Sequence, residues 1–229
     1  MTSVYLKRKF VLNSKQNTNI MKKGSFIAIY GINNLGKSTQ VALLVEKLKQ
    51  IGVDVISLKY ALYDLEPSGP ILNDYLRKGN PYKLSHREFK IFHAMNRTQN
   101  DANIRSMIES GKTVIVEDYT GTSIAWGVGS GVDKEFIEKI NSHLLEPDMA
   151  ILLDGKRFTD GIEEGHKHES DNDLTEKVRQ VHLELAREQG WRPVNANQSR
   201  EEVHEQIMKL YHTTFSKGPS ALDVASTRV

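Results

Sequence analysis

Residues 25–50 read SFIAIYGINNLGKSTQVALLVEKLKQ, and this stretch decides the fold class. The apolar run Ser25–Tyr30 predicts a buried β-strand, and the amphipathic stretch Ser38–Gln50 predicts a helix. Between them lies Gly31–Ser38, a complete match to the pattern G-x-x-x-x-G-K-[ST] in the strand–loop–helix setting that the pattern requires. The stretch therefore predicts a P-loop, in which backbone N–H groups and a helix N-terminus bind the phosphates of a nucleotide.

The residues of this loop have distinct expected tasks. We expect Lys37 to act as a catalytic cation on the β- and γ-phosphates of ATP, and the Ser38 hydroxyl to bind Mg²⁺. The glycines let the backbone come close to phosphate oxygens. The predicted ATP-binding residues are Gly31, Asn34, Leu35, Gly36, Lys37, Ser38 and Thr39.

The rest of the chain alternates short apolar runs with amphipathic stretches, which is typical of a parallel sheet flanked by helices. A capping box at Ser85 and Glu88 predicts the start of a long helix that runs to Glu109. We therefore predict an α/β chain with a three-layer P-loop NTPase fold, built on a parallel β-sheet of about five strands. Further strands are predicted at residues 53–58, 113–116, 149–154 and 192–195, and further helices at residues 71–77, 132–145, 174–189 and 199–215.

These patterns predict one domain, at residues 23–216, with a polar lid at about residues 155–173. No internal repeat or low-complexity segment interrupts it. Residues 1–22 are expected to form a flexible basic leader, with a targeting peptide as the alternative, and residues 217–229 a flexible tail.

Composition narrows the function classes. The 229 residues contain no cysteine, which excludes disulfides and thiol catalysis within the chain. No apolar run approaches the ~20 residues that a membrane helix needs, so we expect a cytoplasmic protein with no membrane contact. Residues 1–23 hold six basic and no acidic residues, so the remainder carries a net charge of −4 within the total of +2. A mildly acidic body argues against nucleic acid as a partner.

Several motifs beyond the P-loop resemble those of the thymidylate kinase family, in the same order along residues 24–215. Gln40 follows the P-loop as it does in that family, and Glu66–Gly69 (EPSG) is similar to its E-P-G-G segment. Phe92–Arg97 (FHAMNR) resembles its F-x-x-x-R helix motif. Val116–Trp126 (VEDYTGTSIAW) resembles its D-R-Y-x-x-S-x-x-A-Y segment.

The resemblance implies an activity and its reactants. It implies transfer of the γ-phosphate of ATP, with Mg²⁺, to a deoxynucleoside monophosphate, with the conversion of dTMP to dTDP as the leading reaction. Since phosphoryl transfer needs positioning and charge neutralisation more than covalent chemistry, a mobile lid that excludes water is expected. The family is commonly dimeric, so a homodimer is implied as well. The alternatives are a P-loop kinase for another acceptor, such as a deoxynucleoside, and an ATP-binding protein without turnover.

The resemblance also implies residues on the acceptor side. Arg97 matches an arginine that helps to hold the acceptor nucleotide. His93 and Phe92 are the two candidates for the aromatic platform under the base, because that platform lies one helical turn before the arginine. Trp126 stands where the family has a tyrosine beside the sugar, with a packing role as the alternative. Ser123, in the D-R-Y-like segment, is expected to bind the acceptor too.

Other positions depart from the family's pattern at the sugar, the metal and the acceptor phosphate. The arginine of D-R-Y is replaced by Asp118, which would repel an acceptor phosphate unless Mg²⁺ lies between them. We interpret Glu117 as the counterpart of the family's aspartate and expect it to be a catalytic residue, with Asp118 among the residues that bind the acceptor. Ser38, Glu117 and Asp118 are thus the predicted Mg²⁺ ligands, with an Asp118 that points away as the alternative. Asn33 replaces the family's acidic P-loop residue and can still hydrogen-bond a sugar hydroxyl.

Cations of the family are also missing from this chain. No arginine flanks Glu66–Pro67, and Lys59 or Arg77 could substitute for it. The P-loop supplies no arginine either, so the lid is expected to provide the catalytic cation. Our choice is Arg157, and the alternatives are Lys156, His166, Lys167 and His168. Asn197 belongs to a segment similar to the family's adenine-side loop and is the predicted contact there.

Overall fold

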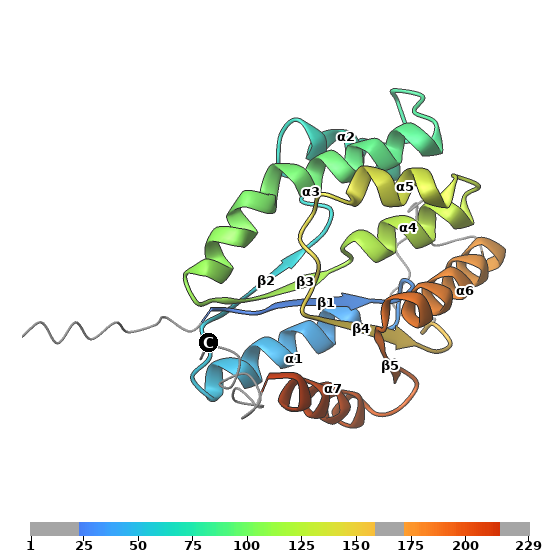
Figure 1. Cartoon of the computed structure of the whole chain (residues 1–229). Coiled ribbons are helices and arrows are strands. Elements are labelled where there is room, and N and C mark those ends of the chain that lie inside the picture. Colours follow the sequence, from blue (N-terminus) through green and yellow to red (C-terminus); the bar gives the residue numbers. More distant parts are fainter. Residues whose placement is uncertain (1–22, 159–171, 216–229) are drawn as a thin grey trace, which may run out of the picture.

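The computed structural model describes residues 23–158 and 172–215, whose strands form one sheet (Figure 1). Neighbouring strands all pair in parallel, in the order β2-β3-β1-β4-β5. The predicted parallel sheet of five strands is confirmed. Their bounds are β1 (Phe26–Tyr30), β2 (Val55–Lys59), β3 (Thr113–Glu117), β4 (Met149–Asp154) and β5 (Arg192–Asn195). The expectations for residues 1–22, for residues 217–229 and for most of the lid lie outside the described residues.

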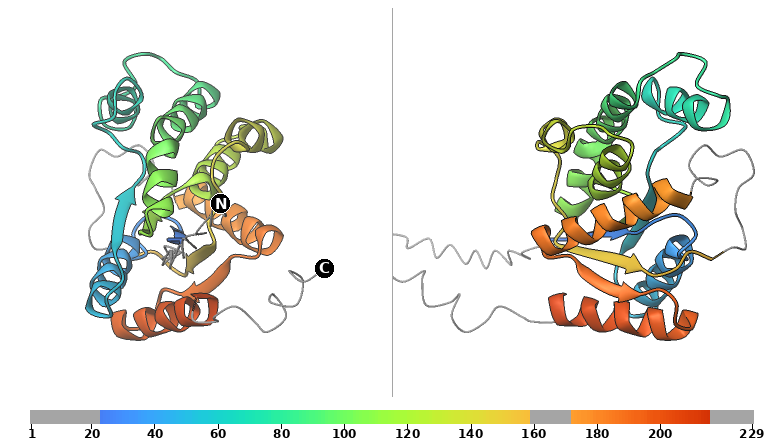
Figure 2. Two further views of the ribbon diagram at one scale, coloured as in Figure 1. Left: turned by 60° about the vertical axis from the view of Figure 1, so that its left-hand side comes forward. Right: turned by 90° about the vertical axis from the view of Figure 1, so that its right-hand side faces the viewer.

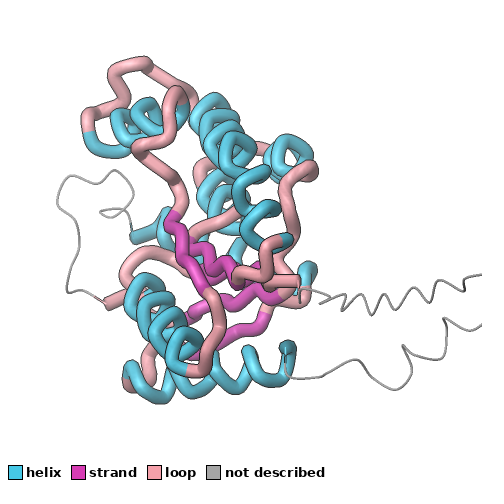
Figure 3. Tube along the Cα trace, turned by 90° about the vertical axis from the view of Figure 1, so that its left-hand side faces the viewer, coloured by secondary structure: helices cyan, strands magenta, loops and turns pink. Residues whose placement is uncertain are grey.

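Helices cover both faces of the sheet and give the three predicted layers (Figure 2). Helices α1 (Lys37–Gln50) and α7 (Arg200–Phe215) lie side by side on one face. Figure 3 shows the strands crossing the molecule between the two helical layers. Among the described helices, none combines the length and the apolar character that a membrane span requires. The opposite side carries α2 (Ser68–Arg77), α3 (His86–Glu109), α4 (Thr120–Gly129), α5 (Lys134–Asn141) and α6 (Asn172–Gln189).

The central strands are buried because helices cover both of their faces. Every residue of β1 and β3 is buried, including the polar Thr113 and Glu117, as expected of a parallel sheet. The register with β3 places Ile29 of β1 opposite Glu117, and the register with β4 places Tyr30 opposite Leu152. The carboxyl ends of β1, β3 and β4 therefore meet at one edge of the sheet.

Helix α3 begins as its capping box predicts. The Ser85 hydroxyl accepts a hydrogen bond from the Glu88 N–H at 3.2 Å, and the Ser85 N–H donates to Glu88 Oε2 at 2.8 Å. These two bonds satisfy backbone donors that a helix start leaves unpaired. They set where α3 begins, and therefore which of its residues face the sheet edge.

A helix that the sequence pattern does not predict, α4, follows β3 directly. Its sequence TGTSIAWGVG contains three glycines, which disfavour a helix. Tertiary contacts override this propensity because the glycines let neighbours come close. An added Cβ at Gly121 would clash with the Trp191 ring, and one at Gly129 would lie 2.7 Å from a Val178 methyl group.

The other predicted helices differ from the structure only at their bounds. Helix α2 begins at Ser68 rather than at residue 71, because Pro70 falls within the first turn, where its missing N–H is tolerated. The helix predicted at residues 132–145 is shorter. Asp133 caps α5 by accepting a hydrogen bond from the Phe136 N–H at 2.8 Å, and α5 ends at Asn141.

Replacing Gly121 with alanine tests the close approach of α4. We expect Gly121→Ala to lower the free energy of unfolding by about 1–3 kcal/mol, because the added methyl group overfills the contact with Trp191. Urea unfolding measures the change. The control is Ser106→Ala at an exposed position of α3, which should change stability by less than about 0.5 kcal/mol. Equal stability of Gly121→Ala and the wild type would contradict the close contact.

Candidate functional site

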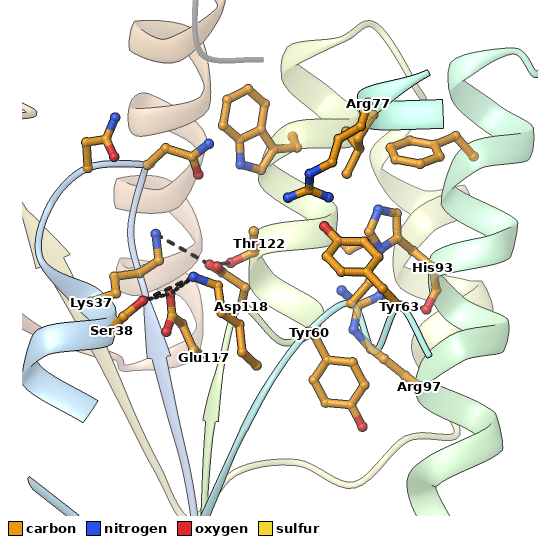
Figure 4. A pocket seen from close by; sticks show the side chains of 18 of the residues that line it. Lys37, Ser38, Tyr60, Tyr63, Arg77, His93, Arg97, Glu117, Asp118 and Thr122 are labelled. Atoms are coloured by element: carbon orange, nitrogen blue, oxygen red, sulfur yellow. Dashed lines mark hydrogen bonds and ion pairs between the residues drawn. The ribbon is translucent and has the colours of Figure 1, made fainter. Parts of the chain in front are cut away.

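A cavity of about 500 Å³ opens at the carboxyl edge of the sheet, between the P-loop and helix α3 (Figure 4). The walls come from the P-loop, the segment after β2, helices α2 and α3, the end of β3 with α4, and Phe158 after β4. Most of the predicted site residues line it. They are Asn33, Asn34, Gly36, Lys37, Ser38, Thr39, His93, Arg97, Glu117, Asp118, Ser123 and Trp126.

Two glycines make the P-loop turn possible. Gly31 and Gly36 have φ values of 143° and 76°, a range that residues with a side chain rarely adopt. A Cβ on Gly31 would lie 2.5 Å from the Leu153 carbonyl oxygen, so the loop passes directly over the end of β4. The Lys37 ammonium turns back and donates to the Ile32 carbonyl oxygen at 2.8 Å. This bond holds the lysine against the loop, at the wall of the cavity.

Two predicted P-loop contacts do not line the cavity. Gly31 lies at the start of the loop, against the Leu153 carbonyl group of β4, on the side away from the cavity. The Leu35 side chain is 3% exposed and belongs to the hydrophobic core. Any contact that these two residues make with a phosphate would have to come from their backbone N–H groups, which is how a P-loop binds phosphate.

The predicted metal ligands Ser38 and Glu117 converge on one another. The Ser38 hydroxyl donates to Glu117 Oε1 at 3.0 Å. The Lys59 ammonium contacts both oxygens, at 3.0 Å from Ser38 Oγ and 2.9 Å from Glu117 Oε1. A cation already lies where these two oxygens meet, so the donor set suits a small hard cation such as Mg²⁺.

Asp118 turns its carboxylate toward the P-loop lysine and the cavity. Its Oδ1 lies 3.6 Å from Lys37 Nζ and accepts a hydrogen bond from the Thr122 hydroxyl at 3.0 Å. The backbone at Asp118 has φ 62°, so the chain turns sharply between β3 and α4. Burial raises the pKa of this carboxyl, and the nearby Lys37 opposes the rise. The geometry places a second carboxylate beside Glu117.

Arg97 is a charged side chain buried at the α3 side of the cavity, 2% exposed. Its two terminal nitrogens donate to backbone carbonyl oxygens, one to His93 at 3.1 Å and one to Tyr119 at 2.9 Å. The Arg97 Nε has no hydrogen-bond partner among the described residues. Two carbonyl groups therefore fix the guanidinium group, and its Nε–H donor stays unused within the described chain.

The structure separates the two candidates for the base platform. His93 lines the cavity, and its ring stands nearly perpendicular to the Phe89 ring, with the centroids 4.6 Å apart. Phe92 does not line the cavity and packs instead against a second apolar cluster that includes Phe89 and Leu72. Of the two, only His93 is placed to stack on a ligand in this cavity.

Helix α4 supplies two more predicted residues to the cavity. Trp126 lines the cavity although its side chain is mostly buried. It therefore packs against its neighbours and forms part of the cavity wall at the same time. The Ser123 hydroxyl is buried with no hydrogen-bond partner in the described part of the chain. An unpaired buried hydroxyl is costly, and a ligand in the cavity could supply its partner.

The segment that reaches the cavity after β2 differs from the one that the motif comparison singled out. Glu66–Gly69 starts α2 and does not line the cavity; the Glu66 carbonyl oxygen instead accepts a hydrogen bond from Gln99 Nε2 at 2.5 Å. The lining residues here are Lys59, Tyr60, Ala61 and Tyr63. Their position at or just after the end of β2 could have predicted their place in the cavity, since the carboxyl ends of parallel strands meet at one edge of the sheet.

Both proposed substitutes for the missing arginine, Lys59 and Arg77, line the cavity. Arg77 comes from the last turn of α2, and its guanidinium carbon lies 4.8 Å from the centre of the Tyr63 ring. Figure 4 shows Arg77 above Tyr63 and His93, on the side of the cavity away from Ser38. The cavity thus carries two cations, one on β2 and one at the end of α2, that lie outside the recognised motifs.

Lys90 is a further residue that the sequence pattern does not single out. It lies on α3 and lines the cavity, yet only 3% of it is exposed. Burial, helped by the charge of Arg97, lowers the pKa of its ammonium group from 10.5 to about 7. A lysine in such a setting is a candidate functional group.

The predicted lid and adenine-side residues lie outside this cavity. The Arg157 guanidinium donates to Asn172 Oδ1 at 2.7 Å, at the start of α6. Asn197 binds the backbone of Lys156, accepting from its N–H at 2.6 Å and donating to its carbonyl oxygen at 2.7 Å. The other lid candidates, His166, Lys167 and His168, lie outside the described residues.

Phosphoryl transfer needs a loop for a triphosphate and an adjoining pocket for the acceptor, since donor and acceptor must meet in a fixed orientation. Fold and site together therefore define a P-loop phosphotransferase of the nucleotide kinase class.

Comparisons with known proteins extend this assignment. A family model described as thymidylate kinase matches residues 29–207. A thymidylate kinase from Halothermothrix orenii is 31% identical over 209 residues, which cover 83% of this chain and 96% of that protein. A probable thymidylate kinase from Pyrococcus abyssi is 32% identical over 202 residues, covering 82% and 96%. The solved thymidylate kinase of Candida albicans has the same fold, with a TM-score of 0.70 at 23% identity, and the match covers 83% of this chain and 92% of that one.

The chain belongs to the thymidylate kinase family, because the family model spans most of its length and relatives above 30% identity cover more than four fifths of it.

The buried lysine leads to a prediction about stability and pH. Below pH ~7 Lys90 is protonated in both the folded and the unfolded chain and adds no pH dependence. Between pH ~7 and 10.5 the unfolded chain holds a proton that the folded chain lacks, so the free energy of unfolding should rise with pH, by up to about 1.4 kcal/mol per pH unit. Lys90→Met should lose this slope in urea unfolding measured from pH 6.5 to 9.5.

The exposed Lys139 of α5 provides the matched control, because Lys139→Met should keep the wild-type pH dependence. Parallel curves for the wild type and Lys90→Met would show that Lys90 keeps an ordinary pKa in the folded protein.

Proposed function

We propose that this protein transfers the γ-phosphate of ATP to the 5′-phosphate of dTMP, giving dTDP. Membership of the thymidylate kinase family supports the reaction. The observation that carries the proposal is a single cavity lined both by the P-loop residues Lys37 and Ser38 and by Arg97 of α3. A donor phosphate on the loop and an acceptor nucleotide on α3 would then face each other across a short gap.

The P-loop supplies the donor side of this proposal. Lys37 is held by the Ile32 carbonyl oxygen and faces Asp118, so a γ-phosphate would take the place of these weaker partners. An ammonium group on the phosphate being transferred neutralises charge as it moves to the acceptor. Arg157 and Asn197 remain our proposed contacts at the lid and on the adenine side.

Magnesium belongs to the proposed reaction. The oxygens of Ser38 and Glu117 already share a cation, the Lys59 ammonium, so this donor set fits the ion, and Asp118 is our third proposed ligand. When bound there, Mg²⁺ would neutralise phosphate charge and hold the phosphates in orientation. Lys59 would be released from Glu117 in that state and would face the acceptor phosphate, in place of the arginine that the chain lacks.

The acceptor base and sugar are proposed to lie along α3 and α4. His93 would stack on the base, and Arg97 would offer its free Nε donor. Trp126 would close the sugar side, and the unpaired Ser123 hydroxyl would gain a partner. Asn33, at the P-loop side of the cavity, would reach the sugar hydroxyl.

A coupled assay of ADP release tests the function. With ATP and Mg²⁺ fixed, dTMP should give the highest kcat/KM among dTMP, dUMP, dCMP, dAMP, dGMP and thymidine. A higher kcat/KM with thymidine than with dTMP would indicate a nucleoside kinase, and ATP binding without turnover on any acceptor would indicate a binding protein. The proposed homodimer is measured separately, by light scattering of the full chain.

Removing the P-loop ammonium should abolish transfer without unfolding the protein. We expect Lys37→Ala to lower kcat by at least about a hundredfold, because Lys37 is the one charged residue of the loop Gly31–Ser38. Thermal unfolding checks that the fold persists. Lys47→Ala, at an exposed position of the same helix, should turn over like the wild type. Undiminished turnover in Lys37→Ala would refute the proposed mechanism.

The role of Asp118 can be read from its amide variant. If the carboxylate binds the metal, Asp118→Asn should raise the Mg²⁺ concentration for half-maximal rate by about tenfold or more, with the KM for dTMP little changed. Mn²⁺ binding in the presence of ADP gives a readout independent of turnover. The opposite pattern, a lower KM for dTMP with unchanged Mg²⁺ dependence, would show that Asp118 repels the acceptor phosphate. Asp54→Asn, at an exposed residue of the β2 side, is the control.

A further inference from the structure

One wall of the cavity is a loop that has no regular secondary structure. Strand β2 ends at Lys59 and helix α2 begins at Ser68, so residues 60–67 form this β2–α2 loop. Its residues Tyr60 and Tyr63 line the cavity, and Figure 4 shows both of them on the α3 side. A loop lacks the hydrogen-bond ladder that holds a strand, so its position depends on the elements that it contacts.

Asn96 of α3 binds the middle of this loop through both backbone groups of one residue. The Leu62 N–H donates to Asn96 Oδ1 at 2.9 Å, and Asn96 Nδ2 donates to the Leu62 carbonyl oxygen at 2.9 Å. Asn96 Nδ2 also donates to the Ser68 hydroxyl at 2.8 Å, at the start of α2. The Asn96 side chain is fully buried, so these bonds are shielded from water. One side chain therefore joins α3, the loop and α2.

Two more side chains on the same face of α3 bind the loop. Gln99 Nε2 donates to the Glu66 carbonyl oxygen, and Asn100 Nδ2 donates to the Tyr60 hydroxyl at 3.2 Å. These residues follow Asn96 by three and four positions, the spacing that places side chains on one face of a helix. Helix α3 thus contacts the loop at its beginning, middle and end, and Asn96 holds the middle.

The first turn of α2 lies against the same part of the loop. A Cβ placed on Gly69 would clash with the carbonyl oxygens of Leu62 and Tyr63. The loop therefore has no room to move toward α2, while the two bonds from Asn96 hold it against α3. The position of the loop is fixed from both sides.

Filling the core does not by itself require an amide at this position. A leucine would occupy a similar volume, but it would leave the Leu62 N–H and carbonyl groups without their Asn96 partners. Backbone groups that lose their partners inside a protein are costly. The Asn96 amide offers an acceptor oxygen and two N–H donors, and the Leu62 and Ser68 groups use all of them. It is therefore matched to the loop that forms the cavity wall.

We propose that Asn96 is a positioning residue for the acceptor, because it fixes how far the β2–α2 loop stands from α3 and thereby the width of the cavity at that end. This inference rests on the proposed function, which places the acceptor along α3. Phosphoryl transfer needs close alignment of donor and acceptor, and a shift of about 1 Å can lower the rate about a hundredfold. A loop released from Asn96 would carry Tyr60 and Tyr63 away from the acceptor.

Steady-state kinetics of two variants of the full chain test the proposal. Asn96→Ala removes all three hydrogen bonds, and Asn96→Leu removes them while it keeps the volume of the side chain. In each, kcat/KM for dTMP should fall by about tenfold to a hundredfold. The affinity for a non-hydrolysable ATP analogue, measured by isothermal titration, should stay within about twofold of the wild type, because Asn96 binds the loop and α2 rather than the P-loop.

Asn141→Ala provides the matched control. Asn141 is a buried amide on α5, lies outside this cavity and donates to the Ile137 carbonyl oxygen at 2.8 Å. Its replacement should lower stability in urea unfolding yet leave kcat/KM for dTMP within about twofold of the wild type. A folded Asn96→Ala or Asn96→Leu that behaves in the same way would show that Asn96 only stabilises the fold, and would overturn the proposal.

Hydrogen exchange of the wild type gives a readout that needs no variant. The Leu62 N–H exchanges when its bond to Asn96 opens. If the acceptor binds only while this bond is closed, dTMP at about a hundred times its Kd should slow exchange at Leu62 by about a hundredfold. Amides at the end of α7 should exchange as before. Unchanged exchange at Leu62 with dTMP bound overturns the proposal.

The outcome for Asn96 and the outcome for the proposed function can be told apart with a panel of acceptors. If the wild type prefers thymidine or another monophosphate to dTMP, the proposed reaction fails, while a lower kcat/KM for that acceptor in Asn96→Ala still supports the role of Asn96. If the wild type prefers dTMP and the folded Asn96 variants match it, the role of Asn96 fails alone. A wild type that turns over none of these acceptors overturns both.

Discussion

The parallel register between β1 and β3 is the constraint on which the site depends. It sets Ile29 opposite Glu117, so the chain leaves β3 beside the P-loop and Glu117 meets the Ser38 hydroxyl at 3.0 Å. Because side chains alternate along a strand, a slip of one residue would turn Glu117 to the other face of the sheet and away from Ser38. Both strands are buried on both faces, so the apolar core holds the register and thereby the geometry of the two carboxylates.

Charge is distributed over the cavity in a way that suits two anionic ligands. Near the P-loop, Lys37 and Lys59 are each matched by a carboxylate, so the apoprotein carries little uncompensated charge there. On α3, Arg97 and Lys90 are buried, and neither forms an ion pair with a carboxylate of the described residues. This end is held in shape by the backbone bonds of Arg97 and by Gly127 of α4, which lets the Lys90 stem approach closely. Burying these polar groups lowers the stability of the folded protein, and a ligand would supply the hydrogen-bond partners that they lack.

Much of the architecture was accessible from local sequence. The P-loop match, the apolar runs of the sheet and the Ser85–Glu88 capping box are patterns in which neighbouring residues satisfy one another, and each appears in the structure. Most of the predicted site residues follow, since they lie in the P-loop or at the carboxyl ends of buried strands and on helices that face them. Helix α4 is the exception, because its glycines argue against a helix and only its contacts with Trp191 and Val178 explain it.

The sequence by itself determined the class of fold, the phosphate loop and the family, because these depend on residue types at short, regular spacing. Only the tertiary structure decided that His93 rather than Phe92 lines the cavity, that Lys59 rather than the EPSG segment meets the loop, and that Lys90 is buried there. Neighbouring residues on a helix can face the core or the cavity, as Phe92 and His93 do. Likewise, a few residues after a strand decide whether a side chain lines the cavity. Such differences are set by contacts between elements distant in the chain, which no local pattern records.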